Sequence, residues 1–226
     1  MRRQELHLRP INRNLDQFVL DIEFLLISVI QGVALAELAV MAAPILANLQ
    51  WNYIPYVAGG FFFILIFWSG AIIHAVSFID WPLDLTHNFL YFLASLFEVM
   101  AFANMKDPLR WFGFVAVFFI IAELLYIADL ILIKRRQKRF LKTPSFKMLY
   151  EHIYKEQKFE LSILVPLGIL FNLGCIYLIM QFPAFFLIQQ GHTWLAVIQA
   201  AFAIIFLLNA THAFKKRSAL IQQSQN

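Results

Sequence analysis

Residues 161–214 read LSILVPLGILFNLGCIYLIMQFPAFFLIQQGHTWLAVIQAAFAIIFLLNATHAF, a stretch that contains no Asp, Glu, Lys or Arg. Residues 38–79 lack the same four residue types. A soluble domain of this size must cover its surface with polar groups, so uncharged runs of this length indicate segments that face lipid or other membrane helices. The whole chain agrees, because 61% of its 226 residues are hydrophobic and only 14% are charged. The sequence therefore predicts an integral membrane protein.

Proline breaks and polar clusters divide the apolar sequence into six segments, each near the ~20 residues that a helix needs to cross a bilayer. Lipid permits no open sheet edge and the sequence has no alternating strand pattern, so we expect every segment to be a helix. The predicted fold is an all-α polytopic membrane protein with one transmembrane domain over residues 1–226. The predicted spans are 20–47, 54–79, 83–105, 109–133, 161–181 and 193–214.

Lys and Arg are distributed unevenly between the two sides of these spans. Of 18 such residues, four precede the first span, nine lie within 134–160 and three follow the sixth, leaving Lys106 and Arg110 on the other side. Because cytoplasmic loops are enriched in Lys and Arg, we expect a multi-pass protein of the cell inner (plasma) membrane with both termini and the 134–160 loop in the cytoplasm. Three tryptophans fall at the predicted outer boundary, as in an aromatic belt: Trp51, Trp111 and Trp194.

The basic loop over 134–160 carries a helical pattern of its own. After Pro144, apolar residues recur at helical spacing opposite charged ones, which predicts a short amphipathic helix lying flat on the inner leaflet. A lipid or partner docking site on this loop is the alternative, although ordinary charge asymmetry explains the same basic residues. The net charge of +4 has the same origin, so we expect no nucleic-acid partner.

Acidic residues lie within the predicted spans, although a carboxylate at the bilayer centre costs roughly 2.5–3.5 kcal/mol. Glu37, Glu98 and Glu123 fall in the central or outer part of the membrane, and Asp21 and Glu23 lie towards the cytoplasmic end. No Lys or Arg lies deep within the spans, so protonation, an incoming cation or water must compensate these carboxylates. This pattern favours a cation or a proton as the transported species.

The first span has the pattern of a pore-lining helix. Glu23 and Glu37 are fourteen residues apart, nearly four helical turns, so they share one face. Ile27 and Ile30 lie between them and would form a hydrophobic constriction. Asp21 and Glu23 would attract cations at the cytoplasmic mouth, and Glu37 would be the outer acidic position. The alternative is that Glu37 is neutral, or bonded to a neighbouring span, and simply packs.

Small residues recur every four positions along another side of the first span, at Ser28, Gly32 and Ala36. Small side chains let two membrane helices approach closely. We therefore expect a close helix neighbour on this side, which would leave the acidic face towards a cavity or a symmetry axis.

Histidines near the cytoplasmic end form a second group of titratable residues. His74 beside an acid would suit pH sensing, with Glu98 and Glu123 as further pH-sensitive or coupling groups. Asp84 and His87 are one turn apart and are weak metal-ligand candidates, but their spacing matches no metal motif, so we expect no metal and no cofactor. The sequence has no nucleophile, phosphate-binding or Ser/His/Asp motif, which makes an enzyme the minority interpretation.

The first half of the chain resembles the transmembrane protein 175 family of cation channels, which has six spans per repeat. That family's first helix opens with a Phe-Ser-Asp motif, where this chain has Phe18-Val19-Leu20-Asp21, with an extra residue and no serine. Its second helix carries a Trp followed by a His, as Trp68 and His74 do here at a longer spacing, and its third begins like Asn88-Phe89-Leu90-Tyr91-Phe92. The resemblance implies a potassium- or proton-permeable pore made by several copies of the first span.

Together these patterns predict a six-helix protein of the lipid bilayer that passes a monovalent cation or a proton through an oligomeric pore. One chain of six spans rarely encloses a water path without copies of itself, so we expect a homo-oligomer. Two alternatives remain open. One is a proton-coupled small-solute carrier with Glu98 and Glu123 as coupling sites. The other is a non-transporting scaffold or accessory subunit whose basic loop recruits a partner.

Overall fold

The computed structural model describes residues 9–78, 85–140 and 144–225, and every regular element in these ranges is a helix. The predicted all-α fold is confirmed. The long helices are α1 (Arg9–Ala47), α2 (Ile54–Phe78), α3 (Leu85–Ala103), α4 (Pro108–Phe140), α5 (Pro144–Phe159), α6 (Val165–Gln181) and α7 (His192–Gln225). Three short helical turns lie between them: η1 (Trp51–Tyr53), η2 (Glu160–Leu164) and η3 (Ala184–Ile188).

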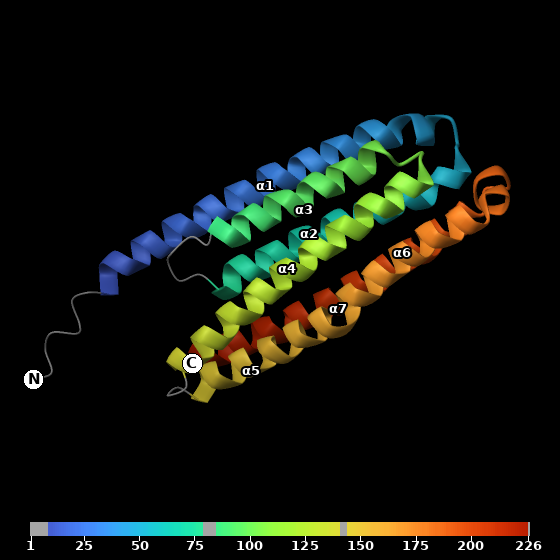
Figure 1. Ribbon diagram of the computed structural model, residues 1–226. Helices are drawn as coiled ribbons and strands as arrows, with labels where there is room; N and C mark the ends of the chain where they lie inside the picture. Colours follow the sequence, from blue (N-terminus) through green and yellow to red (C-terminus); the bar gives the residue numbers. More distant parts are fainter. Residues whose placement is uncertain (1–8, 79–84, 141–143, 226) are drawn as a thin grey trace, which may run out of the picture.

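The helices form an elongated antiparallel bundle (Figure 1). α1 packs against α2 and α3, α4 packs against α3 and α6, and α2 packs against α7. The start of α1, the ends of α2 and α4 and the end of α7 lie at one end of the bundle. The connections from α1 to α2, from α3 to α4 and from α6 to α7 lie at the other end, which we call the closed end.

Within the described residues, five helical segments are long and apolar enough to cross a membrane. Their bounds are Asp21–Ala47, Trp51–Ile72, Pro108–Lys134, Glu151–Gln181 and His192–His212. They overlap five of the six predicted spans. The predicted span 83–105 corresponds to α3, whose 19 residues are not among these candidates within the described part of the chain. The chain is thus an all-α protein with five candidate membrane spans, as a multi-pass membrane protein requires.

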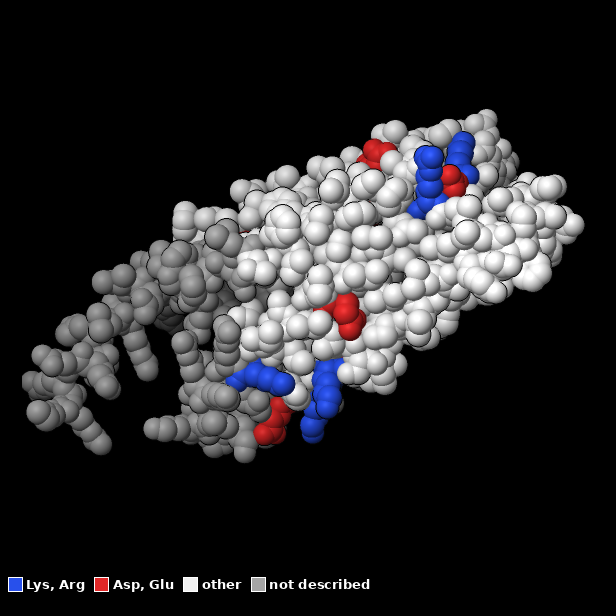
Figure 2. All heavy atoms as spheres, viewed as in Figure 1, with Lys and Arg blue, Asp and Glu red and all other residues white. Residues whose placement is uncertain are grey.

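The outer surface of the bundle is apolar over most of its length. Large apolar side chains such as Leu25, Val40 and Leu170 are exposed on it. Figure 2 shows a broad, mostly uncharged band between groups of charged side chains near its two ends. A lipid bilayer is the surroundings in which such a surface is stable, because in water it would expose far more contiguous apolar area than soluble proteins show.

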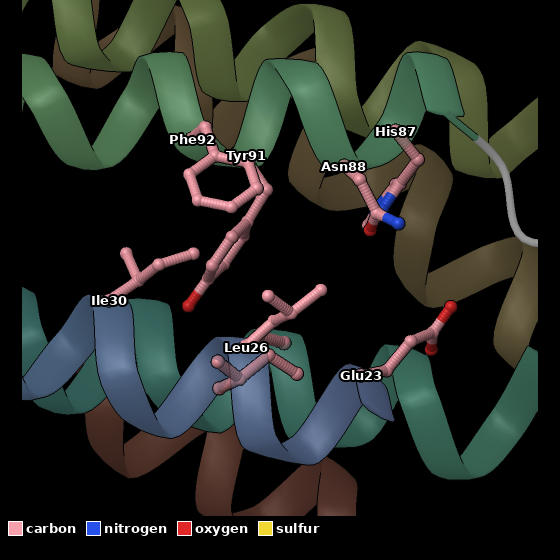
Figure 3. Close-up of a pocket in the computed structure, with 9 residues that line it drawn as sticks. Glu23, Leu26, Ile30, His87, Asn88, Tyr91 and Phe92 are labelled. Carbon is pink, nitrogen blue, oxygen red and sulfur yellow. The ribbon is translucent and has the colours of Figure 1, made fainter. Parts of the chain in front are cut away.

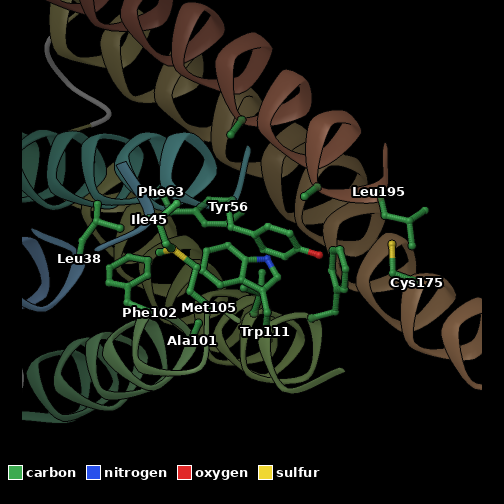
Figure 4. Close-up of a cluster of buried hydrophobic side chains, with 14 of the residues drawn as sticks. Leu38, Ile45, Tyr56, Phe63, Ala101, Phe102, Met105, Trp111, Cys175 and Leu195 are labelled. Atoms are coloured by element: carbon green, nitrogen blue, oxygen red, sulfur yellow. The ribbon is translucent and has the colours of Figure 1, made fainter. Parts of the chain in front are cut away.

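The largest described cluster of buried apolar side chains lies towards the closed end, where aromatic rings from several helices meet (Figure 4). The rings of Tyr56 and Trp111 contact edge to face, with centroids 5.2 Å apart. Gly60 lets α2 approach its neighbours, because a Cβ there would lie 2.9 Å from a ring carbon of Phe102 and 3.0 Å from Leu38. Any larger residue at this crossing would therefore force the Phe102 or Leu38 side chain to shift from the packing that is observed.

Two of the three tryptophans predicted for the aromatic belt lie at the surface of the described structure. Trp51 and Trp194 are 69% and 70% exposed near the closed end. Trp111 is fully buried in the core instead, so its assignment to the belt was wrong. The reason is that its indole N–H has a hydrogen-bond partner inside the bundle, and a paired indole can be buried at little cost.

The segment 144–159 is helical, as predicted, but α5 does not lie apart from the bundle. It packs against α4 and α7, and it continues through η2 into α6 as one rod. Ile153 and Gln157 of α5 are buried. The prediction of a helix lying flat on the leaflet was therefore wrong, because α5 runs on into α6 and its described apolar residue Ile153 is covered by protein.

The small-residue side of α1 has no helix neighbour among the residues that the structure describes. Ser28, Gly32 and Ala36 are exposed, and a Cβ at Gly32 would meet no atom within 4 Å. The predicted close packing on this side was therefore wrong for a single chain. α1 instead turns a different side inwards, and the residues buried there recur at helical spacing: Ile27, Gln31, Ala34 and Leu38.

Candidate binding cavity and its polar neighbours

A cavity of about 450 Å³ lies among α2, α4, α6 and α7. α4 packs on α6 and α2 packs on α7, and the cavity lies between these two pairs. Its size falls within the range of about 300–1,000 Å³ that is typical of sites for small molecules. Eight phenylalanines line it: Phe63, Phe67, Phe118, Phe119, Phe159, Phe171, Phe202 and Phe206.

The inner wall of the cavity carries a chain of side-chain hydrogen bonds. Trp111 Nε1 donates to Gln199 Oε1 across 2.7 Å, and Gln199 Nε2 donates to Asn172 Oδ1 across 2.7 Å. Asn172 Nδ2 in turn donates to the backbone oxygen of Gly168 across 2.7 Å. These bonds join α4, α7 and α6 and engage both amides with protein groups. An amide without such partners would be costly in an apolar interior, so the chain of bonds explains how Asn172 and Gln199 can be buried there.

The opposite end of the cavity, which we call the mouth, is polar and acidic. His87 Nε2 lies 3.4 Å from Asp129 Oδ1, and both side chains are largely buried. Glu160 and Gln157 line the same region, as does Asn209. Asn209 is exposed, as are the lining residues Leu167 and Ile205, so the cavity reaches the surface at more than one place. Among the described lining residues, Asp129 and Glu160 carry negative charge and none is a Lys or an Arg.

Glu98 lies behind the cavity wall, buried between α3 and α1. Gln31 Nε2 donates to Glu98 Oε2 across 3.4 Å and to the Tyr91 hydroxyl across 3.3 Å. Tyr91 itself lines the cavity, so Gln31 and Tyr91 connect this carboxyl group to the cavity. Among the side chains that the structure describes, Glu98 Oε1, Gln31 Oε1 and the Ser95 hydroxyl have no hydrogen-bond partner. Buried polar atoms left in this state are uncommon and mark a place where a proton or a water can bind.

A second, much smaller space of about 20 Å³ lies between α1 and α3. Figure 3 shows Glu23, Leu26 and Ile30 of α1 on one side and His87 and Tyr91 of α3 on the other. Its volume suits about one water molecule. His87 and Tyr91 line both this space and the large cavity, so their side chains form part of the wall between them.

The predicted pore residues of α1 do not share one environment. Ile27 is 8% exposed and packs in a cluster with Ala71 and Tyr91, and Ile30 packs against the same cluster. These isoleucines therefore face other helices of the same chain. The three acids of the same prediction differ from one another: Asp21 is exposed, whereas Glu23 and Glu37 are partly buried.

The predicted coupling acids also lie apart. Glu98 is 3% exposed and bonded to Gln31, whereas Glu123 is only partly buried and is not among the residues that line the cavity. Within the described chain, no hydrogen bond or ion pair joins any two of Glu37, Glu98 and Glu123. Of these three acids, Glu98 is the one that is connected to the cavity.

The predicted titratable group near the cytoplasmic end is described in part. His74 belongs to α2, but its side chain lies outside the described structure, as does the whole of Asp84. His87 is paired with Asp129 of α4. The described residues contain no group of three or more His, Cys, Asp or Glu that could hold a metal ion.

Sequence reasoning missed most of the cavity. Asp129 and Tyr91 belong to it, yet they lie on different helices, 38 positions apart in the sequence. The available signal was compositional, since 25 phenylalanines in 226 residues are enough to line an interior space. The pairing of His87 with Asp129 has no local signature because the two residues are on different helices.

The closed end of the bundle is held by a second polar cluster. The Tyr56 hydroxyl lies 3.0 Å from His192 Nδ1, and both residues are buried. The side chain of Asn52 bonds to that of Gln190, and Thr193 Oγ1 donates to the backbone oxygen of Asn52 across 3.3 Å. These contacts tie η1 and the start of α2 to the connection between α6 and α7.

No protein-family model matches the chain, and no curated protein or solved structure matches it. The resemblance to the transmembrane protein 175 family therefore stays a prediction.

Proposed function

We propose that the protein is a proton-coupled membrane carrier of a small, largely apolar solute. The observation that carries this proposal is a cavity of about 450 Å³ beside the buried carboxyl group of Glu98. Tyr91 lines the cavity and is connected to Glu98 through Gln31. An aromatic-lined cavity with polar groups at defined positions is the usual form of a small-molecule site. A carboxyl group buried at membrane depth is the usual form of a proton-coupling site.

Coupling follows from the hydrogen bonds of Gln31. Its amide donates both to Glu98 and to Tyr91, so a solute that displaces the Tyr91 side chain changes the position of the group that supports the carboxylate. Ionised Glu98 depends on that donor, whereas protonated Glu98 is neutral and can itself donate to Gln31 Oε1. Solute binding and proton binding thereby affect each other, which is the requirement for coupled transport.

In the proposed topology the chain crosses the membrane six times, α3 is the third crossing and both termini are in the cytoplasm. It is supported by the antiparallel arrangement of the helices in Figure 1 and by the excess of Lys and Arg near the end that carries the termini. The mouth of the cavity lies towards that same end, and the Tyr56–His192 cluster lies at the other.

The first-helix cation pore also stays a prediction, with less support. Its constriction residue Ile27 is buried against α2 and α3, so α1 would have to rotate before this side chain could face an axis shared by several copies. The exposed side of α1 carries Ser28, Gly32 and Ala36 rather than the predicted acidic face.

Flux measurements test the carrier. Proteoliposomes that contain the full chain and an entrapped pH-sensitive dye are given a panel of small cationic, neutral and anionic solutes, and solute-driven proton movement is recorded. We expect at least one solute to move protons through the wild type, Glu98→Gln to abolish that movement, and Glu37→Gln to leave it unchanged, because Glu37 is not among the cavity-lining residues.

Each other outcome has a definite meaning. Proton movement with no solute in the wild type, reduced by Glu37→Gln and unaffected by Glu98→Gln, supports the first-helix pore and contradicts the carrier. An absence of flux with every solute contradicts both transport functions and favours the scaffold.

A further inference from the structure

We infer that the cavity takes up a single hydrocarbon chain that ends in one small polar group, and that this molecule enters sideways from the bilayer, through an opening between α6 and α7. The inference rests on the proposed function only for transport, where it names the solute as a single-chain amphiphile. Binding follows from the cavity itself, from the depth of its opening and from the groups at its two ends.

The opening lies where α6 and α7 separate. α6 packs on α4 and α7 packs on α2, while the rings of Phe171 on α6 and Phe202 on α7 lie edge to face with centroids 5.7 Å apart. About one turn from this ring pair, Leu167 and Ile205 both line the cavity, and they are 47% and 63% exposed. Because these two side chains face the cavity and also the surface, the cavity communicates with the surface between them.

This opening lies at the depth of the bilayer core. Leu167 is near the middle of the candidate span Glu151–Gln181, and Ile205 is within the candidate span His192–His212. Both belong to the run 161–214, which contains no Asp, Glu, Lys or Arg. In a membrane the liquid outside the opening is therefore hydrocarbon and not water. A molecule that enters here comes from the lipid, and an apolar chain makes that step without exposure to water.

The shape of the cavity fits one extended chain. Its lining residues run from Gln199 to Ala210 on α7 and from Phe118 to Asp129 on α4, which is eleven positions or about 16 Å of helix in each case. At about 30 Å³ for each heavy atom, the share that one water takes in its liquid, 450 Å³ holds roughly fifteen such atoms. A single chain has this size, whereas the two chains and head group of a phospholipid need far more space.

The two ends of the cavity suit the two ends of such a molecule. At the inner wall, Gln199 and Asn172 are bonded to each other and to further protein groups, so a hydrocarbon end fits there without stripping an amide of its partner. The phenylalanines between the ends give an apolar space, which gains dispersion contacts when a hydrocarbon fills it. At the mouth, the amides of Gln157 and Asn209 line the cavity, so the polar group of the ligand lies beside them.

Photolabelling of the purified full-length protein in lipid nanodiscs tests the inference. The probe is tetradecanol with a diazirine in the middle of its chain, and mass spectrometry locates the adducts after irradiation. We expect adducts on Ala122 and Ala203, which are buried and line the cavity. Leu173 is exposed outside the cavity and reports contact with the surrounding lipid, whereas Phe112 is buried away from the cavity and should carry no adduct. Excess unlabelled tetradecanol should suppress the adducts on Ala122 and Ala203 and leave those on Leu173.

Variants at the opening test the route of entry. Leu167→Trp with Ile205→Trp narrows the opening, and we expect it to abolish or slow the appearance of adducts on Ala122 after the probe is added. Leu170→Trp with Leu208→Trp is the matched control, because these leucines are exposed on the same two helices and are not among the lining residues. We expect the control to label like the wild type.

A second kind of variant fills the cavity. Gly70 lines it, and a Cβ there would meet no atom within 4 Å, so Gly70→Phe has room for the first atom of the new side chain. Gly174→Phe is its control, since Gly174 is equally open but is not among the lining residues. We expect Gly70→Phe to abolish the suppressible adducts on Ala203 and Gly174→Phe to preserve them.

The inference is overturned if the probe labels Leu173 but neither Ala122 nor Ala203, or if the variant with both tryptophans at the opening takes up the probe as fast as the wild type. A phospholipid that carries the same diazirine should label Leu173 alone. Its adducts on Ala122 and Ala203 would assign the cavity to membrane lipid and contradict a single-chain ligand.

The outcomes for the site and for the carrier are separate. Suppressible adducts in the cavity without solute-driven proton movement contradict the carrier and leave the site in place. Proton movement driven by water-soluble solutes, with no adducts in the cavity, contradicts the inference and leaves the carrier in place.

Discussion

Trp111 on α4 donates its indole N–H to the Oε1 atom of Gln199 on α7, across 2.7 Å. The two residues are 88 positions apart in the sequence, and both are buried where the dense core meets the cavity. Gln199 also donates to Asn172 on α6, so this one amide holds three helices at a common depth. The cavity keeps its inner wall because these helices are fixed to one another there.

Gln199→Leu is expected to destabilise the bundle by about 1–3 kcal/mol, because it leaves the Trp111 indole N–H and Asn172 Oδ1 buried without partners. Unfolding of the purified protein in detergent, followed by intrinsic fluorescence, measures the change. Gln181→Leu is the control, since Gln181 is exposed at the end of α6 and its loss strips no buried group of a partner. Equal destabilisation by the two variants would contradict a structural role for the Trp111–Gln199 bond.

Gln31→Leu is expected to lower the stability by about 1–3 kcal/mol, since it removes the donor to both Glu98 and Tyr91. The double variant Gln31→Leu with Glu98→Leu should recover most of the loss, because two apolar side chains leave no carboxyl group to satisfy. The four proteins form a double-mutant cycle in denaturant unfolding. Additive losses would show that Gln31 and Glu98 act independently.

Gly60→Ala is expected to destabilise the protein by about 1–3 kcal/mol, because the new Cβ would lie 2.9 Å from Phe102 and force α2 away from α3. The control is Gly113→Ala on α4, where a Cβ meets no atom within 4 Å. That variant should be neutral or stabilising by up to about 1 kcal/mol, as alanine favours a helix more than glycine does. Thermal unfolding of both variants, compared with the wild type, measures the difference.

Cysteine labelling tests whether α3 crosses the membrane. In a Cys175→Ser background, which has no other cysteine, we expect Lys106→Cys to react with an impermeant maleimide in intact cells and Lys155→Cys to react only in inverted vesicles. Both lysines are exposed, so access to the reagent depends on the side of the membrane. Reaction of Lys106→Cys only in inverted vesicles would place the start of α4 inside and would mean that α3 does not cross.

The positions of the helices could be predicted from the sequence because hydrophobic length is a local property. The uncharged run 161–214 contains the apolar parts of α6 and α7, and the breaks at Pro82 and Pro108 separate predicted spans whose residues form α2, α3 and α4. The prediction for 83–105 shows the limit of that reasoning. This segment forms a helix, but its described residues include His87, Asn88 and Glu98, which reduce its apolar character.

The side of each helix that packs against its neighbours could not be predicted in the same way. Helices that are apolar on all sides carry little periodic signal, so the sequence does not show which side meets a neighbour and which meets lipid. The pore interpretation placed Ile27 on an open face and the small residues of α1 in a contact, and the packing is the reverse.

The sequence by itself determined that this chain is helical, where its long apolar segments lie and which polar residues fall within them. Only the tertiary structure decided that Gln31 meets Glu98, that His87 meets Asp129 and that a cavity remains among α2, α4, α6 and α7. The physical reason is that burial preference depends on each residue and its near neighbours. The rotation of one helix against another depends instead on how side chains from distant parts of the chain fill the space between them.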